Sequence, residues 1–132
     1  MSDLVRPSVR PQPMISVVDV ARASAWYQQV LGAVSGHGGD EYEQLLVDGQ
    51  MILQLHRLEV GHHHGTIGDP ALPTGNGVAI WFEAERFDEL VDRLRQIDAR
   101  IETDVHLNAN AGRREIWVRD LDDYLVVLAE PY

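Results

Sequence analysis

The chain has 132 residues, of which 45% are hydrophobic and 24% charged, proportions that are ordinary for one soluble globular domain. Its 11 basic residues are all arginine and stand against 21 acidic ones, so the formal charge is −10 and we expect no binding to nucleic acid or to a membrane surface. No cysteine is present, which excludes disulfides, thiolate metal sites and a cysteine nucleophile. Because no apolar run reaches about 20 residues and the N-terminus lacks the apolar core of a secretory signal, we expect a cytoplasmic protein.

The first half of the chain predicts a strand, a helix and further strands. A polar, proline-punctuated arm precedes a β-branched run at residues 14–18. Asp19 is a good N-cap, Gly32 a good helix end, and the apolar residues between them share one helix face: Ala23, Trp26, Tyr27, Val30 and Leu31. After a further short strand near Val34 and a loop over residues 36–40, two strands at 42–47 and 51–58 flank an Asp-Gly hairpin turn.

The second half repeats this plan. Residues 59–76 form a long loop rich in Gly, Pro and His, followed by a strand at 78–83. A helix face then combines Phe87, Leu90, Val91 and Leu94. A short strand at 100–103 and a loop at 105–112 are expected next. The chain closes with strands at 113–119 and 124–130 around an Asp-rich turn, in which Asp123 can adopt a left-handed conformation.

This internal symmetry predicts an α+β fold. Two βαβββ modules, at about residues 13–58 and 77–130, would form a curved, mostly antiparallel cup with the helices outside. Residues 59–76 would link the modules, and the whole chain, residues 1–132, would be one domain.

Two segments carry a resemblance to a known family. VVDVARASAWYQQVLGA resembles the opening strand and helix of the vicinal oxygen chelate superfamily, which includes glyoxalase I, bleomycin resistance proteins and extradiol dioxygenases. REIWVRDLDDYLVVLAE is similar to the closing hairpin of that superfamily. The resemblance covers roughly residues 13–130 and implies the same cup of paired modules.

The resemblance also implies where metal ligands would lie. At those positions this sequence has Gln12, Gln54, Gly77 and Val127. Neutral amides bind divalent metals weakly and the other two offer no ligand side chain, so the usual metal site is absent and no cofactor is expected. What remains is closest to the metal-independent bleomycin resistance branch, and Pro13 matches the proline that precedes its first strand. In that branch the N-terminal arm crosses to a partner subunit, which implies a homodimer.

Strand alternation places several candidate ligand-binding side chains on the inner face of the cup. They are Gln54 and His56 from the first module and Trp81, Glu115 and Trp117 from the second, with Asn108 and Asn110 at the rim. Two indoles and a carboxylate suit a planar guest that can carry a positive charge. The alternatives are core packing for the tryptophans and an ion pair of Glu115 with Arg113 or Arg114. For the asparagines the favoured interpretation is turn chemistry.

The function expected from this face is sequestration of a planar, aromatic or cationic natural-product antibiotic, without catalysis. The His62-His63-His64 triplet lies in a loop and is read as a solvated or weakly metal-binding lid. An alternative keeps a divalent metal and makes the protein a lyase, isomerase or dioxygenase, with a displaced site that would draw on His56, His62, His64 and His106.

Overall fold

The computed structural model describes residues 9–58, 65 and 67–132. The first module contains β1 (Met14–Val17), α1 (Val20–Leu31), β2 (Val34–His37), β3 (Tyr42–Val47) and β4 (Gln50–Arg57). The second contains β5 (Ala79–Glu83), α2 (Phe87–Gln96), β6 (Arg100–Asn108), β7 (Arg113–Arg119) and β8 (Leu125–Ala129). The predicted α+β fold of two βαβββ modules is confirmed. Neither α1 nor α2 is long and apolar enough to cross a membrane.

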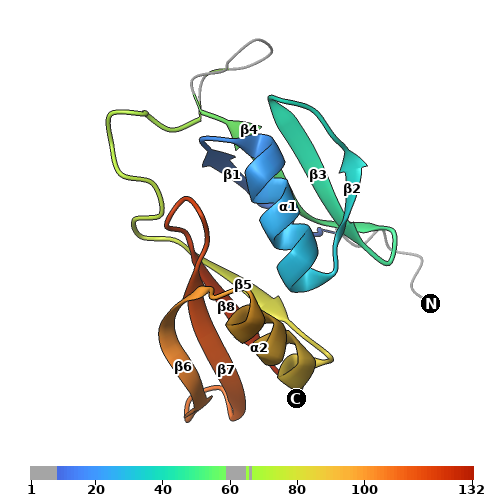
Figure 1. The fold of residues 1–132 in the computed structure, drawn as a ribbon, viewed down its shortest axis with the longest axis vertical. Coiled ribbons are helices and arrows are strands. Elements are labelled where there is room, and N and C mark those ends of the chain that lie inside the picture. The colour runs from blue at the N-terminus through green and yellow to red at the C-terminus, as the bar shows by residue number, and fades with distance from the viewer. Residues whose placement is uncertain (1–8, 59–64, 66) are drawn as a thin grey trace, which may run out of the picture.

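Each module builds one open, four-stranded sheet (Figure 1). The strand order is β1-β4-β3-β2 in the first sheet and β5-β8-β7-β6 in the second. In both sheets the first and last strands of the module lie next to each other in parallel, and the remaining neighbours are antiparallel. Equivalent strands therefore occupy equivalent places, as the repeated sequence plan predicts.

Residues at or near the ends of both helices stabilise those ends. The side chain of Asp19 accepts a hydrogen bond from the backbone N–H of Arg22, and Gly32 closes α1 in the left-handed region at φ 71°. In α2, acidic residues occupy the first turn and arginines the last, which suits the helix dipole. Both predicted apolar faces pack into the core, and only Leu31 among those residues is partly exposed.

The predicted turns are also present. Asp48 and Gly49 both have positive φ, 51° and 76°, which a tight hairpin turn needs at its two central positions. Asp123 has φ 66°, the left-handed conformation expected for it.

The prediction for residues 100–112 was wrong in part. The short strand expected to end at residue 103 continues to Asn108 as β6, and the turn shrinks to residues 109–112. Pairing with β7 explains the difference, because His106 lies opposite Glu115 and Asn108 opposite Arg113. Pairing with β7 gives the backbone N–H and C=O groups of this segment hydrogen-bond partners that a loop would not provide.

Each sheet has a helix face and an open face. In the first sheet Ile15, Leu53 and Leu55 pack with α1, whereas Tyr42, Gln44 and Gln54 alternate to the other side. In the second sheet Ile116 and Val118 are in the core. The open face of this sheet therefore carries the odd-numbered β7 residues: Arg113, Glu115, Trp117 and Arg119.

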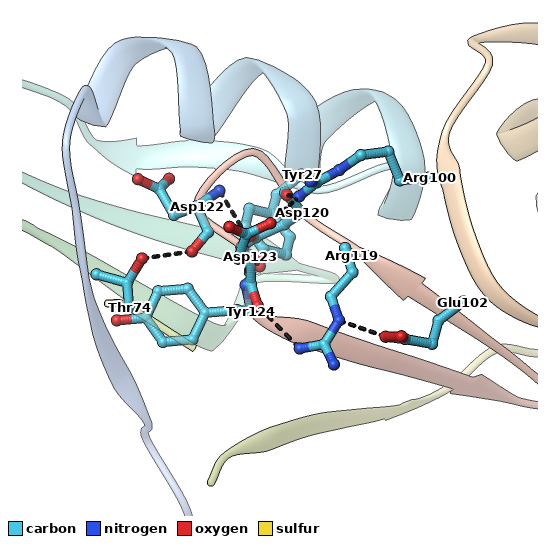
Figure 2. Close-up of polar contacts among 9 residues, drawn as sticks. All are labelled: Tyr27, Thr74, Arg100, Glu102, Arg119, Asp120, Asp122, Asp123 and Tyr124. Carbon is cyan, nitrogen blue, oxygen red and sulfur yellow. Dashed lines mark hydrogen bonds and ion pairs between the residues drawn. The ribbon is translucent and has the colours of Figure 1, made fainter. Parts of the chain in front are cut away.

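The β7–β8 turn connects the two modules (Figure 2). The buried Tyr27 hydroxyl of α1 donates to the buried Asp120 carboxylate, and Asp120 also accepts the backbone N–H groups of Asp122 and Tyr124. Burial raises the pKa of both the Asp120 carboxyl and the Tyr27 phenol. Because these contacts reach from the second module into the first, the turn fixes how the modules meet.

Candidate functional site

On the open face of the first sheet, Gln54 belongs to a chain of hydrogen bonds. Its Nε2 donates to the backbone carbonyl of Gln12 at 3.0 Å, and its Oε1 accepts from the Tyr42 hydroxyl at 2.5 Å. Gln44 in turn donates from Nε2 to the Tyr42 oxygen at 3.0 Å. Sequence reasoning missed Tyr42 and Gln44, although strict alternation along residues 42–47 puts both on the same face of the sheet.

His56 lies on the same face, two residues along β4. It is only 6% exposed, and its Nδ1 lies 2.9 Å from the carbonyl oxygen of Arg57. The linker covers its neighbour on β1, since the Ser16 hydroxyl donates to the Ile67 carbonyl. This end of the face is therefore closed, while Tyr42, Gln44 and Gln54 stay partly exposed.

On the open face of the second sheet, Glu115 is fully buried and both of its oxygens accept hydrogen bonds. The Trp117 indole N–H donates to Oε1 at 2.7 Å, and the Asn108 amide donates to Oε2 at 3.1 Å. These donors satisfy a carboxylate that would otherwise be costly to bury. The ion pair expected with Arg113 or Arg114 does not form, because Arg113 faces Glu83 and Arg114 binds Glu130 and Asp88.

His106 adds a third contact to the same carboxylate. Its Nε2 lies 3.3 Å from Glu115 Oε1, and its Nδ1 lies 2.8 Å from the carbonyl oxygen of Asp104. A carbonyl only accepts, so Nδ1 carries a hydrogen, and Nε2 donates to Glu115 when the ring is the charged imidazolium. The ring also meets the Trp117 indole edge-on, with 6.2 Å between the centroids. Glu115 thus holds an indole and an amide in fixed positions, with the His106 ring beside them.

Asn108 and Asn110 have different roles. The Asn108 side-chain oxygen accepts the backbone N–H groups of Asn110 and Ala111, which is the turn chemistry that the sequence favoured. Its amide nitrogen is thereby turned toward Glu115. Asn110 is exposed and contributes its backbone to the same turn.

The two tryptophans flank Val127. In register, Trp81 of β5 and Trp117 of β7 both lie opposite Val127 of the central strand β8. Adjacent strands are about 4.8 Å apart, so the two indole-bearing positions are separated by roughly 10 Å. Trp81 is 41% exposed, whereas Val127 is 1% exposed. Trp81 is therefore not a core residue, whereas Val127 between the two indole-bearing positions is covered.

A cavity of about 900 Å³ lies between the modules and reaches Trp81. It is lined by residues 10–15, 49–52 and 78–83, which come from the arm, β1, the β3–β4 hairpin, β4 and β5. Gln12, whose carbonyl fixes Gln54, lines the same cavity. The predicted residues thus form two groups on two sheets, and among those that the structure describes Trp81 alone lines the cavity.

The residues at the family's metal-ligand positions do not fit a metal. The Gln54 carboxamide is already hydrogen-bonded on both sides, Val127 is buried, and Gly77 has no side chain. Within residues 9–58, 65 and 67–132, no three His, Asp or Glu side chains gather as a metal would require. His56 and His106 belong to different sheets, and His62, His63 and His64 lie outside the described residues.

Comparison with known families gives a match over most of the chain. The family model described as "Glyoxalase/Bleomycin resistance protein/Dioxygenase superfamily" matches residues 10–128. No curated protein sequence matches.

Solved structures share the fold at low sequence identity. A lactoylglutathione lyase from Agrobacterium tumefaciens is 21% identical, with a TM-score of 0.69 and 94% of each chain covered. The fosfomycin resistance protein FosX from Listeria monocytogenes is 18% identical, with a TM-score of 0.67 and 96% of each chain covered. TioX from Micromonospora sp. ML1 is 18% identical, with a TM-score of 0.72, and the match covers 93% of this chain and 98% of that one.

Proposed function

The chain belongs to the glyoxalase/bleomycin resistance protein/dioxygenase superfamily, and we propose that it binds and sequesters a planar natural-product antibiotic, neutral or cationic, without a metal. The observation that carries this proposal is the pair of indoles at Trp81 and Trp117 on either side of Val127. Trp81 is exposed and Trp117 partly exposed, so a planar aromatic guest can stack on the indole faces. Resistance to an antibiotic is stated for one relative, FosX.

Exposure supports a binding role for the tryptophans. A large aromatic side chain exposed at a cavity loses water when a flat ligand stacks on it, and indoles are favoured anchors for that reason. Trp81 has this setting, since it is 41% exposed and lines the cavity between the modules. Trp26, in contrast, is packed in the core against Tyr27.

Glu115 serves the site as a positioning residue. Because Glu115 is 0% exposed and both of its oxygens accept hydrogen bonds, it influences a ligand only through the side chains that it orients, Trp117 and Asn108. By accepting the indole N–H, the carboxylate also makes the Trp117 ring more electron-rich toward a cationic guest. Asn108 and Asn110 are placed at the rim of the proposed site. On the first sheet the predicted Gln54 is already hydrogen-bonded on both sides and the predicted His56 lies at the closed end of the face, so neither carries the proposal.

Metal independence is the second part of the proposal. It is supported by the chemistry of Gln12, Gln54, Gly77 and Val127, none of which is a strong ligand for a divalent metal. No other cofactor is expected. We also propose that the two modules and their linker act as one domain and that two copies form the binding unit. A single-chain mass by light scattering would contradict the dimer.

A fluorescence titration tests the binding claim. Protein carrying Trp26→Phe keeps Trp81 and Trp117 as its two tryptophans, so quenching of tryptophan emission reports on the open face of the second sheet. Bleomycin and polycyclic aromatic drugs at micromolar concentration are expected to quench this emission, and Trp81→Ala or Trp117→Ala to weaken binding at least about tenfold. The proposal fails if no drug quenches, or if both alanine variants bind as well as the parent protein.

One observation favours the alternative in which the protein is an enzyme. Glu115 and His106 place a carboxylate and an imidazole nitrogen 3.3 Å apart on an open face, and both are ligand types for divalent metals. Elemental analysis of untagged protein decides between the two functions. Stoichiometric metal that is lost in the His56→Ala or His106→Ala variant would favour the lyase, isomerase or dioxygenase.

A further inference from the structure

The hydrogen-bond chain on the open face of the first sheet has a fixed direction. The Gln12 carbonyl only accepts, so the side-chain group that meets it must be the Nε2 of Gln54. The oxygen of that carboxamide is then the one that accepts the Tyr42 hydroxyl hydrogen. Because the Tyr42 hydroxyl donates its only hydrogen to Gln54, its oxygen can only accept from Gln44. This contact orients the Gln44 carboxamide.

This leaves Gln44 with two unused hydrogen-bonding groups. Its Oε1 and its second Nε2 hydrogen have no partner among the residues that the structure describes. The side chain is partly exposed, so both groups are accessible from the open face. The carboxamide thus still offers one acceptor and one donor in one plane, and a ligand group that carries both an N–H and a C=O can pair with them.

We infer that the open face of the first sheet binds a planar, uncharged lactam or carboxamide through Gln44. Tyr42 and Gln54 are positioning residues, because they fix the Gln44 amide before the ligand arrives and so reduce the ordering cost of binding. This inference goes beyond the proposed function, which depends on the tryptophans of the other sheet.

The surroundings of Gln44 favour a flat and neutral guest. His37 lies opposite Gln44 in the β2–β3 ladder, and its ring centroid is 5.6 Å from that of Tyr42. These rings supply a surface on which a heterocycle can stack. The polar side chains that the structure describes on this face are amides, a phenol, a hydroxyl and imidazoles, so it offers a charged ligand neither a carboxylate nor a guanidinium as a partner.

A pair of probes that differ only in the donor tests the inference. We expect 2-quinolone, which presents an N–H beside a C=O, to bind about tenfold more tightly than N-methyl-2-quinolone, because the methyl group removes one of the two hydrogen bonds. Binding is followed by the amide NMR shifts of residues 42–46 and by calorimetry. Gln44→Leu should reduce 2-quinolone affinity to that of the N-methyl compound, and Tyr42→Phe, which frees the Gln44 amide, should weaken it severalfold.

Controls separate this site from the tryptophan site. Gln29→Leu removes an exposed glutamine on α1 and should leave the preference for 2-quinolone unchanged. The double variant Trp81→Ala, Trp117→Ala should also keep the preference, and its loss there would assign the lactam to the second sheet. The inference is overturned if both quinolones bind equally, if neither binds at millimolar concentration, or if folded Gln44→Leu protein keeps the preference.

Discussion

The indole nitrogen of Trp117 donates a 2.7 Å hydrogen bond to Oε1 of Glu115, a carboxylate with no exposed surface. The two residues are neighbours on one face of β7, and the bond fixes the indole that we assign to ligand stacking. Removing the carboxylate is therefore expected to affect both the stability of the protein and the geometry of its proposed site.

Glu115→Gln should destabilise the protein by about 1–3 kcal/mol, because one of the two donors, Trp117 or Asn108, would face an N–H instead of an oxygen. Asn108 cannot turn its oxygen toward the new amide, since that oxygen accepts two backbone N–H groups of the turn. Urea denaturation at pH 7 measures the change. The matched control is Glu102→Gln, which removes a partly exposed ion pair with Arg119 and should cost at most about 1 kcal/mol. Equal losses in the two variants would show that Glu115 holds nothing in place.

Gly75→Ala should be among the most destabilising substitutions in the linker. A Cβ at this position would lie 2.1 Å from the carbonyl oxygen of Asp123, and the residue has φ 84°. The β7–β8 turn would have to move away from the linker, at a cost of more than about 3 kcal/mol. Gly77→Ala has a similar φ of 75° with nothing within 4 Å, so it should cost only about 1 kcal/mol. Thermal unfolding of both variants checks the difference, and similar melting temperatures would contradict the close contact.

Asp120 should make folding pH-dependent. Burial raises the pKa of its carboxyl in the folded protein, so the native state holds this proton more tightly than the unfolded chain does. Its contribution to stability is then greatest below the ordinary Asp pKa of about 3.9 and is lost as pH rises through the folded value. Asp120→Asn has no such titration. The stability of the parent protein relative to this variant should fall as pH rises through that window, and a flat or rising difference in urea denaturation would refute this role.

Arg93 should stabilise the contact between the helices. Its guanidinium donates to the backbone carbonyls of Gln29 and Val30 in the last turn of α1, where carbonyls lack helical partners and the dipole favours a cation. Arg93→Met is expected to cost about 1–2 kcal/mol. Arg86→Met removes an arginine that is 84% exposed and makes one 3.8 Å ion pair, so a change below about 0.5 kcal/mol is expected. If the two variants unfold at the same urea concentration, the contact with α1 contributes nothing.

Local sequence signals were sufficient for most of the fold. Asp19 and Gly32 mark the ends of α1, and Asp48-Gly49 marks a hairpin. These signals can be read from the sequence because each residue determines the backbone conformation only at its own position and its nearest neighbours. The extension of β6 to Asn108 could not be found in this way. It depends on pairing with β7, and strand pairing overrides the turn preference of asparagine.

The candidate site was less predictable than the fold. Alternation along β7 correctly put Glu115 and Trp117 on one face, but the other partners of Glu115 come from β6, which was expected to end before His106. The sequence offered Arg113 and Arg114 as the partners because they are adjacent in the chain. Both instead pair with acidic residues outside the site, which only the packed structure reveals.

The most direct test of tryptophan-mediated binding is the indole N–H spectrum of the protein. Three tryptophans give three resonances in a ¹H–¹⁵N correlation experiment, each assigned by its Trp→Phe variant. On titration with a planar antibiotic that quenches fluorescence, we expect the Trp81 and Trp117 resonances to shift together with one dissociation constant, while that of the core residue Trp26 stays in place. Binding that leaves Trp81 and Trp117 unchanged would contradict the proposed site.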